Sequence, residues 1–387
     1  MPSGPTTAAR TIEVAAKVAA IREWLAATGL PAAVLTRPGS LAWIGAGLTD
    51  PIERGASFAL AWAVVTQDRV AIVTTNVEAP RLRDEATVEA LGFELHAVPW
   101  HDPDGLLALS EAIASVRRAS IAADGQPGFG VDAEVALVGL RLTLAEPEQV
   151  RLRALGLDAA VAIESTIRGW RPGEHDRDLQ ARIAAGLEAA GIFGACLIVG
   201  GDERVERFRH PVAIGARIER LAMAVVVAER GGLHVALTRF ASAGAPSQTV
   251  LATHEAARAV EAHVLDEVRP GVTYGHLVEA LAIGYAGVGA PEAWREHYQG
   301  GPVGYRQREF EIAPGQIDSP WWDRPVAVGD AVAYNPSLAG GGKIEDTFLV
   351  TDDGPDLLTT TDDWPTTASA LSSGRVIPRP AILQILR

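Results

Sequence analysis

Two short stretches of the same composition, Arg171-Pro172-Gly173 and Arg269-Pro270-Gly271, lie 98 positions apart in the chain. Glycine readily takes the left-handed conformation that follows many helices, and proline cannot continue a helix, so each stretch predicts a junction between two helices. Residues after the two stretches match at the same offset: Leu179 and Leu277, Ile183 and Leu281, Leu187 and Tyr285, and Gly191 and Gly289. This agreement predicts a duplicated unit; two unrelated helix junctions are the alternative.

Apolar segments of strand length follow each predicted helix pair. They cover residues 195–199, 221–227 and 233–240 in the first half, and residues 304–312, 331–334 and 343–350 in the second. Short apolar runs bounded by turn residues are typical of buried strands. We therefore expect two helix-helix-strand-strand units folded around a shared site.

The chain before residue 146 has a different pattern. Helical spacing covers residues 12–27, 106–116 and 134–140, and strand-like runs cover residues 32–35, 59–65, 70–73 and 120–123. Helices that alternate with short buried strands indicate a small α/β domain. Because a chain of 387 residues exceeds the size of one ordinary core, we expect two domains, an α/β domain at residues 1–145 and a second domain at 146–387.

Composition limits the partners of this protein. Hydrophobic residues make up 48% and charged residues 21% of the chain, as in a globular protein, and the formal net charge is −14. This charge repels nucleic acid and anionic membranes, so we expect neither as a partner and favour a small-molecule or peptide substrate.

Cysteine usage and hydropathy bear on the compartment. Cys196 is the only cysteine, so an intrachain disulfide and a thiolate metal cluster are both ruled out. The first ten residues lack the pattern of a signal peptide, and no window approaches about 18 uninterrupted apolar residues. We expect a cytoplasmic protein without a membrane span.

The densest run of reactive side chains extends from Arg295 to Glu309 and reads REHYQGGPVGYRQRE. Its glycines allow the backbone to approach a ligand closely. His297, Arg308 and Glu309 supply a proton carrier, a fixed cation and a carboxylate within this short run. We expect the centre of an active site here.

Several segments together carry a resemblance to a known family. They are Arg171-Pro172-Gly173, Phe208-Arg209-His210-Pro211, His297-Tyr298-Gln299-Gly300, Gly329-Asp330, and Ile344-Glu345-Asp346-Thr347-Phe348-Leu349-Val350-Thr351. In this order and spacing they resemble the creatinase, aminopeptidase P and methionine aminopeptidase family (M24). The resemblance implies a creatinase-like N-terminal α/β domain, a pseudo-symmetric pita-bread catalytic domain and a homodimer.

The metal site is where the sequence departs from this family. The resemblance implies that two aspartates, one histidine and two glutamates hold a pair of divalent ions. The matching positions here are a strand at 223–227 without a carboxylate, then Ala236, Gly301, Asn335 and Glu345. One carboxylate and one amide cannot hold two such ions, so we expect no metal and no other cofactor. Replacement of the lost ligands by Glu229 or His234 is the alternative.

Three residues remain as candidates for catalysis. By resemblance to creatinase, which works without metal, His210 matches the histidine that shuttles a proton, and His297 assists. Glu345 follows apolar Ile344 in a predicted strand, so burial there favours its protonated form and a role as acid or base. For each of the three, a purely structural role is the alternative.

Six further residues are candidates for substrate binding. Arg308 can grip a carboxylate through two parallel hydrogen bonds, or it can form an internal ion pair with Glu309. Asn335 can donate to a developing oxyanion. The remaining candidates are Gln299, Tyr305 and Arg239. Since the carboxylates that bind creatine match Thr238 and Asn335 here, creatine itself is not the expected substrate.

We therefore expect a metal-independent hydrolase, or a related C–N bond enzyme, that acts on a small amide, amidine or cyclic amidine-like molecule. One alternative is a divalent-metal-dependent aminopeptidase or dipeptidase that acts on Xaa-Pro peptides. A second alternative is a homologue that binds a ligand or serves as a scaffold without catalysis.

Overall fold

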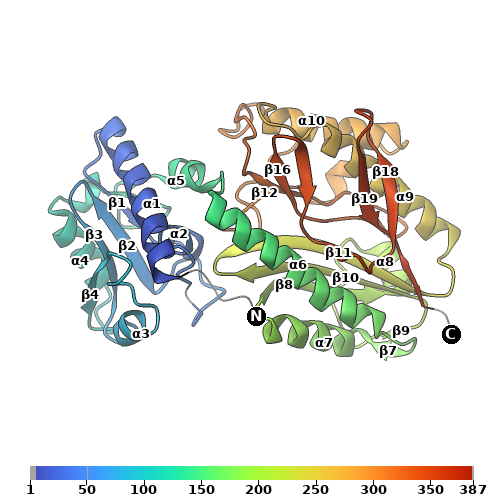
Figure 1. Cartoon of the computed structure of the whole chain (residues 1–387), viewed down its shortest axis with the longest axis horizontal. Coiled ribbons are helices and arrows are strands. Elements are labelled where there is room, and N and C mark those ends of the chain that lie inside the picture. Colours follow the sequence, from blue (N-terminus) through green and yellow to red (C-terminus); the bar gives the residue numbers. More distant parts are fainter. Residues whose placement is uncertain (1–5, 50, 386–387) are drawn as a thin grey trace. The chain divides into compact units, whose positions relative to one another are not determined.

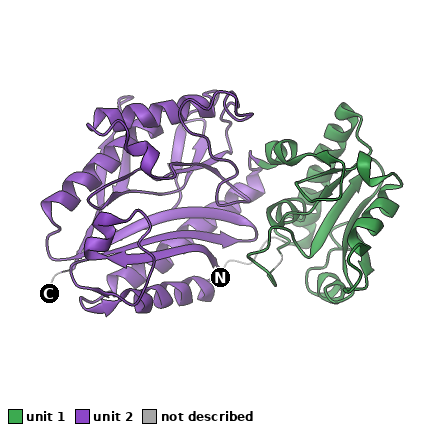
Figure 2. Cartoon of the chain, turned by 180° about the vertical axis from the view of Figure 1, so that it is seen from behind, with its two compact units in different colours: residues 1–141 green, residues 142–387 purple. Residues whose placement is uncertain are grey.

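The computed structural model describes residues 6–49 and 51–385. The chain divides into two compact units, residues 1–141 and 142–387 (Figure 2). None of the described helices is both long enough and apolar enough to span a membrane.

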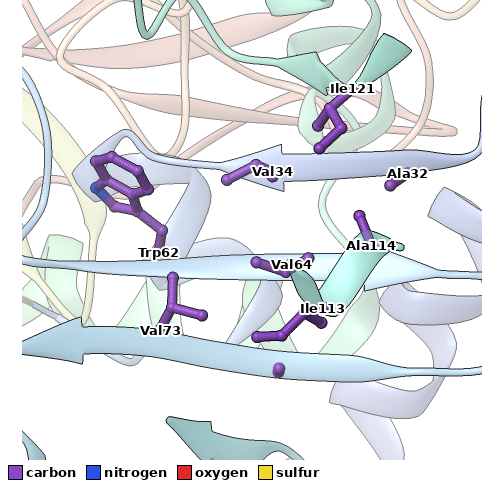
Figure 3. Close-up of a cluster of buried hydrophobic side chains, with 9 residues drawn as sticks. Ala32, Val34, Trp62, Val64, Val73, Ile113, Ala114 and Ile121 are labelled. Atoms are coloured by element: carbon purple, nitrogen blue, oxygen red, sulfur yellow. The ribbon is translucent and has the colours of Figure 1, made fainter. Parts of the chain in front are cut away.

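Unit 1 is built on one mixed sheet with the strand order β4-β3-β2-β1-β5-β6. Its strands are β1 (Ala32–Leu35), β2 (Ala61–Thr66), β3 (Val70–Thr75), β4 (Glu94–Val98), β5 (Ala122–Ala123) and β6 (Val131–Asp132). Figure 3 shows the core on one face, where Trp62, Val64 and Val73 meet Ile113 and other apolar side chains. The continuous apolar runs of β1 and β2 are buried throughout, as expected for strands covered on both faces.

Helices cover this sheet and confirm the α/β class of the unit. They are α1 (Thr7–Thr28), α2 (Pro38–Ile44), α3 (Ala79–Asp84), α4 (Gly105–Ala114), the 3-10 turn η1 (Arg118–Ser120) and α5 (Glu134–Arg141). The predicted helices correspond to α1, α4 and α5. The short helices α2 and α3 were not predicted, because each begins with a proline in its first turn and is too short to show helical periodicity.

Two helix pairs form the outer layers of unit 2 and confirm the predicted repeat (Figure 1). The first pair is α6 (Glu146–Arg168) and α7 (Asp176–Ala189), and the second is α9 (Gln248–Glu267) and α10 (Tyr274–Gly287). Gly173 and Gly271, between the helices of each pair, both have a φ of 89°, a conformation that glycine adopts without strain. The matched apolar residues after them are fully buried: Leu179, Leu277, Ile183, Leu281, Leu187 and Tyr285.

Two antiparallel-rich sheets lie between these helix layers (Figure 1). One has the order β20-β11-β10-β8 and the other β12-β13-β16-β17. The strands of the first sheet are β8 (Phe193–Gly201), β10 (Leu221–Arg230), β11 (Leu233–Ala243) and β20 (Leu383–Ile385). Those of the second are β12 (Gly300–Val303), β13 (Ala331–Tyr334), β16 (Phe348–Thr351) and β17 (Gly354–Leu357). This arrangement is the pita-bread architecture that the resemblance implied.

Smaller elements complete unit 2. They are three two-stranded ladders, β7 (Glu174–His175) with β9 (Arg217–Ile218), β14 (Ser337–Leu338) with β15 (Gly342–Lys343), and β18 (Thr366–Ala370) with β19 (Val376–Pro380), together with α8 (Asp202–Arg207) and the 3-10 turn η2 (Ala293–Glu296). Helix α9 packs against β14, β15 and β18.

Two strand predictions in the second half are wrong. Residues 304–312 form no strand; the strand is β12, which ends at Val303, and the backbone then turns as Tyr305 N–H donates to the Glu309 carboxylate over 2.7 Å. The predicted strand at 343–350 is interrupted at residues 344–347. Glu345 therefore lies between two strands instead of within one.

Buried charges hold this interrupted segment in place. The Asp346 carboxylate accepts from Arg239 Nη1 at 3.0 Å, and its other oxygen lies 2.9 Å from Arg379 Nη1, an ion pair without hydrogen-bond alignment. Arg239 also pairs with Glu164 of α6 at 2.7 Å, and Arg379 with Glu261 of α9 at 2.6 Å. The network therefore connects the interrupted segment to both helix layers.

We expect Asp346→Asn to destabilise the protein strongly, because it leaves two buried guanidinium groups without a shared anion. The cost is about 3–5 kcal/mol in the free energy of unfolding, measured by urea unfolding. Asp356→Asn is the matched control, since this aspartate pairs with Arg153 at the surface and its loss costs at most about 1 kcal/mol. Equal small losses for both variants would contradict a stabilising role for the network.

Candidate functional site

Side chains alternate between the two faces of the first sheet of unit 2, and one of these faces carries the candidate site. Across β8, β10 and β11, Ile198, Val225 and Thr238 lie side by side, and Cys196, Val227 and Ala236 form the next row. Adjacent residues on a strand point to opposite faces, so Arg239 lies on the other face, where it meets α6. Thr238 is the only hydrogen-bonding side chain besides Cys196 in these two rows.

Glu345 reaches this face from the segment between β15 and β16. Its side chain is 1% exposed. One carboxylate oxygen accepts from Thr238 Oγ1 at 3.1 Å, and the other accepts from Arg308 Nη2 at 2.9 Å. The structure therefore brings two of the predicted site residues, Glu345 and Arg308, into one ion pair.

A file of three side chains lies beside this pair. Lys343 Nζ donates to His297 Nε2 at 2.9 Å, and His210 Nε2 lies 3.2 Å from the same nitrogen. Lys343 is buried, His297 is half-buried and His210 is exposed. The file therefore leads from the interior to solvent and joins the two predicted catalytic histidines, which are 87 residues apart in sequence.

Electrostatics keep these imidazoles neutral. Burial, the Lys343 charge and His210 lower the pKa of His297 to about 2. Partial burial, followed by the Lys343 charge, also lowers the pKa of His210 below its usual 6.5. Burial lowers the pKa of Lys343 to about 8, against the opposing effect of Glu345. At neutral pH the file thus holds a mostly charged lysine and two neutral histidines.

Asn335 and Gln299 lie at the same end of β13. Asn335 is 7% exposed, and its buried amide oxygen has no hydrogen-bond partner among the described residues. Both polar atoms of the Gln299 side chain have partners. Its oxygen accepts from Tyr285 at 3.0 Å, and its nitrogen donates to the carbonyls of Trp294 and His297 at 2.9 Å. Asn335 is available to a ligand, whereas Gln299 fixes the backbone that presents His297.

Three predicted substrate-binding residues have other partners in the structure. The Arg239 guanidinium is buried and bonds to Glu164, Asp346 and the Thr359 carbonyl. Tyr305 OH donates to Glu148 of α6 at 2.5 Å. Glu309 accepts from the Tyr305 backbone and so braces the loop that carries Arg308. All three side chains are buried, and these contacts connect them to the elements around the site.

An open pocket of about 600 Å³ lies next to His297. Residues 294–299 and 311–313 and Gln316 line it. Of the predicted site residues, only His297 and Gln299 contribute to its wall. The pocket is therefore a candidate approach to the file and does not contain the Glu345–Arg308 pair.

The donor set of this site does not fit a pair of divalent ions. No group of three or more His, Cys, Asp or Glu side chains that could hold a metal occurs in residues 6–49 and 51–385. The charged neighbour in contact with the Glu345 carboxylate is the guanidinium of Arg308, which would repel a metal ion. Gly301, where the resemblance places the ligand histidine, has a φ of 152° that other residues rarely adopt.

Lys343 is a residue of the candidate site that sequence reasoning missed. Its contact with His297 spans 46 residues and has no local pattern. A compositional signal was nevertheless present, because the chain has only two lysines among 387 residues. Cys196 was also assigned only to an apolar run, although strand alternation places it on the same face as Thr238.

Comparison with solved structures agrees with this architecture. Dipeptidase PepE from Mycobacterium ulcerans has a TM-score of 0.72 and 22% identity, with 93% of this chain and 98% of that chain covered. The Xaa-Pro dipeptidase from Bacillus anthracis has a TM-score of 0.67 and 16% identity, with 90% and 98% covered. The N-terminal domain of the FACT complex subunit SPT16 from Eremothecium gossypii has a TM-score of 0.61 and 13% identity, with 90% and 96% covered. At these identities the likeness shows the fold alone.

Sequence comparison gives the family. Curated protein sequences yield no match. The family model described as metallopeptidase family M24 matches residues 151–352, which is more than half of the chain and includes Thr238, His297 and Glu345. The fold, the helix repeat and this match together show that the chain belongs to metallopeptidase family M24.

Proposed function

We propose that this protein is a metal-independent hydrolase that cleaves a C–N bond in a small amide- or amidine-like molecule, with His210 as the proton carrier. The observation that carries the proposal is the file of Lys343, His297 and His210, which ends at solvent. Its neighbour is a carboxylate already paired with an arginine.

The file determines which nitrogen of His210 can act as a base. Lys343 donates to His297 Nε2, so that nitrogen carries a lone pair and the His210 Nε2–H can share it as a donor. The proton of neutral His210 is then on Nε2, and Nδ1 holds a free lone pair. Nδ1 can accept a proton from water or substrate and return it to the leaving nitrogen.

Two other groups are suited to hold the substrate. The unpaired amide of Asn335 can bond an N–H or a developing oxyanion of an amide or amidine. Glu345 and Arg308 form a fixed dipole in the site. Glu345 assists by bonding substrate or water through the lone pairs that Arg308 and Thr238 leave free.

Two rival functions remain alternatives. The names of two similar structures, a dipeptidase and an Xaa-Pro dipeptidase, favour a metal-dependent Xaa-Pro peptidase. Likeness to a subunit domain of a larger complex favours a binding or scaffold role. Turnover with and without metal separates all three, as described below.

The first test is metal dependence. We expect the purified protein to contain far less than one equivalent of Mn, Co or Zn by elemental analysis. We also expect it to deplete a small amide or amidine in a mass-spectrometric substrate screen equally well before and after chelator treatment. Stoichiometric metal that supports cleavage of Xaa-Pro peptides would establish the rival peptidase.

The second test replaces the proton carrier. We expect His210→Gln to lower kcat by about 10²–10⁴-fold, which is the usual contribution of a general acid–base group. His263→Gln is the matched control, because His263 is an exposed histidine of α9 outside the site. Binding of a pocket ligand that survives incubation, with no turnover by either protein, would favour the scaffold alternative.

The third test is the pH dependence of kcat/KM. A general base works when it is deprotonated, and burial together with Lys343 lowers the pKa of His210 from 6.5. The activity should therefore rise with pH through a value below 6.5 and level off above it. An acid limb above pH 6.5 that is unchanged in His210→Gln would exclude His210 as the base.

A further inference from the structure

Lysine is nearly absent from this chain. Two lysines, Lys17 and Lys343, occur beside 32 arginines among 387 residues. Lysine is ordinarily a surface residue, yet these two are only 5% and 2% exposed. Because arginine supplies the other basic side chains, each buried lysine calls for a local explanation.

Lys17 has an ordinary explanation. Its Nζ lies 2.6 Å from the Glu13 carboxylate and donates to the Trp43 carbonyl at 2.8 Å. The buried ammonium is thus compensated by an anion of the same helix.

Lys343 lacks such an anion. Its Nζ makes one hydrogen bond, to neutral His297, and no carboxylate oxygen of the described residues lies within the 4.0 Å of an ion pair. An ammonium has three N–H donors, so two remain. A buried charge without an opposite partner is costly unless a ligand supplies one.

The other charges of the site are already compensated. Glu345 acts on Lys343 only from beyond ion-pair distance, and its oxygens bond to Arg308 and Thr238. Arg209, whose charge also affects Lys343, pairs with Glu296 at 2.6 Å.

Neighbouring uncharged groups do not supply the missing anion. Burial raises the pKa of the Cys196 thiol, which therefore stays protonated. His297 and His210 are neutral bases and bear no negative charge. The described part of the site thus has an excess of one positive charge, located on Lys343.

We propose that Lys343 anchors a carboxylate of the substrate, so that this site acts on a small monoanionic molecule. The inference rests on the proposed function, since the carboxylate belongs to the molecule whose C–N bond is cleaved. A carboxylate matches the single excess charge and the two remaining donors, whereas a dianionic phosphate would leave negative charge buried.

The position of the anchor limits the length of the substrate. The two contacts of the file are 2.9 and 3.2 Å, so Lys343 Nζ lies at most about 6 Å, the sum of these distances, from His210 Nε2. The proposed base, His210 Nδ1, lies across the same imidazole ring, so a carboxylate on Lys343 presents a C–N bond to it only when the two groups are a few bonds apart. Acylated or amidino derivatives of short amino acids have this form.

The small number of lysines permits a direct test on the full-length protein. Incorporation of lysine labelled with ¹³C at Cε gives two side-chain NMR signals, from Lys17 and Lys343. Titration with acetate at constant ionic strength in chloride should move one signal saturably, because a bound anion changes the Lys343 environment. The Lys17 signal is the internal control and should not move.

Lys343→Met assigns the signals. We expect this variant to bind acetate at least tenfold more weakly than the wild-type protein. Lys343→Arg, which keeps the charge, should lose less of the acetate affinity. Inorganic phosphate and neutral acetamide are titrated in parallel. A Lys343 signal that does not respond to acetate in the wild-type protein would overturn the proposal, and so would tighter binding of phosphate. The wild-type titration decides even if a variant fails to fold.

These measurements involve no turnover, so they fail separately from the proposed function. Acetate binding at Lys343 together with unchanged turnover in His210→Gln would refute the proposed proton carrier and keep the anchor. Loss of turnover in that variant without acetate binding would refute only the anchor.

Discussion

Asp346 is the residue on which the geometry of the site depends, because its carboxylate is shared by Arg239 and Arg379. The segment at 344–347 belongs to no strand and cannot rely on a regular ladder for its position. The Glu345 carbonyl accepts from Thr238 N–H at 2.9 Å. The Thr347 hydroxyl accepts from Ala236 N–H and donates to the Ala236 carbonyl. Buried charge and these bonds together hold Glu345 rigidly, as a preorganised site requires.

Positive charge in the proposed mechanism comes from side chains fixed by the fold. Arg308 pairs with the buried Glu345 carboxylate, and the Lys343 charge interacts with the same carboxylate from beyond ion-pair distance. A guanidinium or an ammonium can orient and stabilise an anion, but neither lowers the pKa of bound water as a metal ion does. Activation of water therefore falls to a neutral imidazole, which explains why His210 is central to the proposal.

Much of the fold could be predicted from the sequence because its signals are local. Pro-Gly junctions and the repeated apolar spacing identified both helix pairs, whereas the run at 304–312 resembled a strand until the Tyr305–Glu309 turn was seen. The histidines and Glu345 could be located from matching segments. Which neighbours they contact could not, since His210, His297 and Lys343 come from distant segments. Strand alternation alone would have separated Thr238 from Arg239, as adjacent residues face opposite sides.

The burial of both lysines also affects the behaviour of the protein in alkaline solution. Its basic side chains outside the core are arginines and histidines, and guanidinium groups keep their protons at any pH that a folded protein survives. A typical surface loses positive charge near pH 10 as its lysines titrate. The described surface lacks lysines and therefore lacks this loss. The net charge of the protein should vary little near pH 10, and so should its solubility and electrophoretic mobility. Most acidic proteins become still more negative in that range.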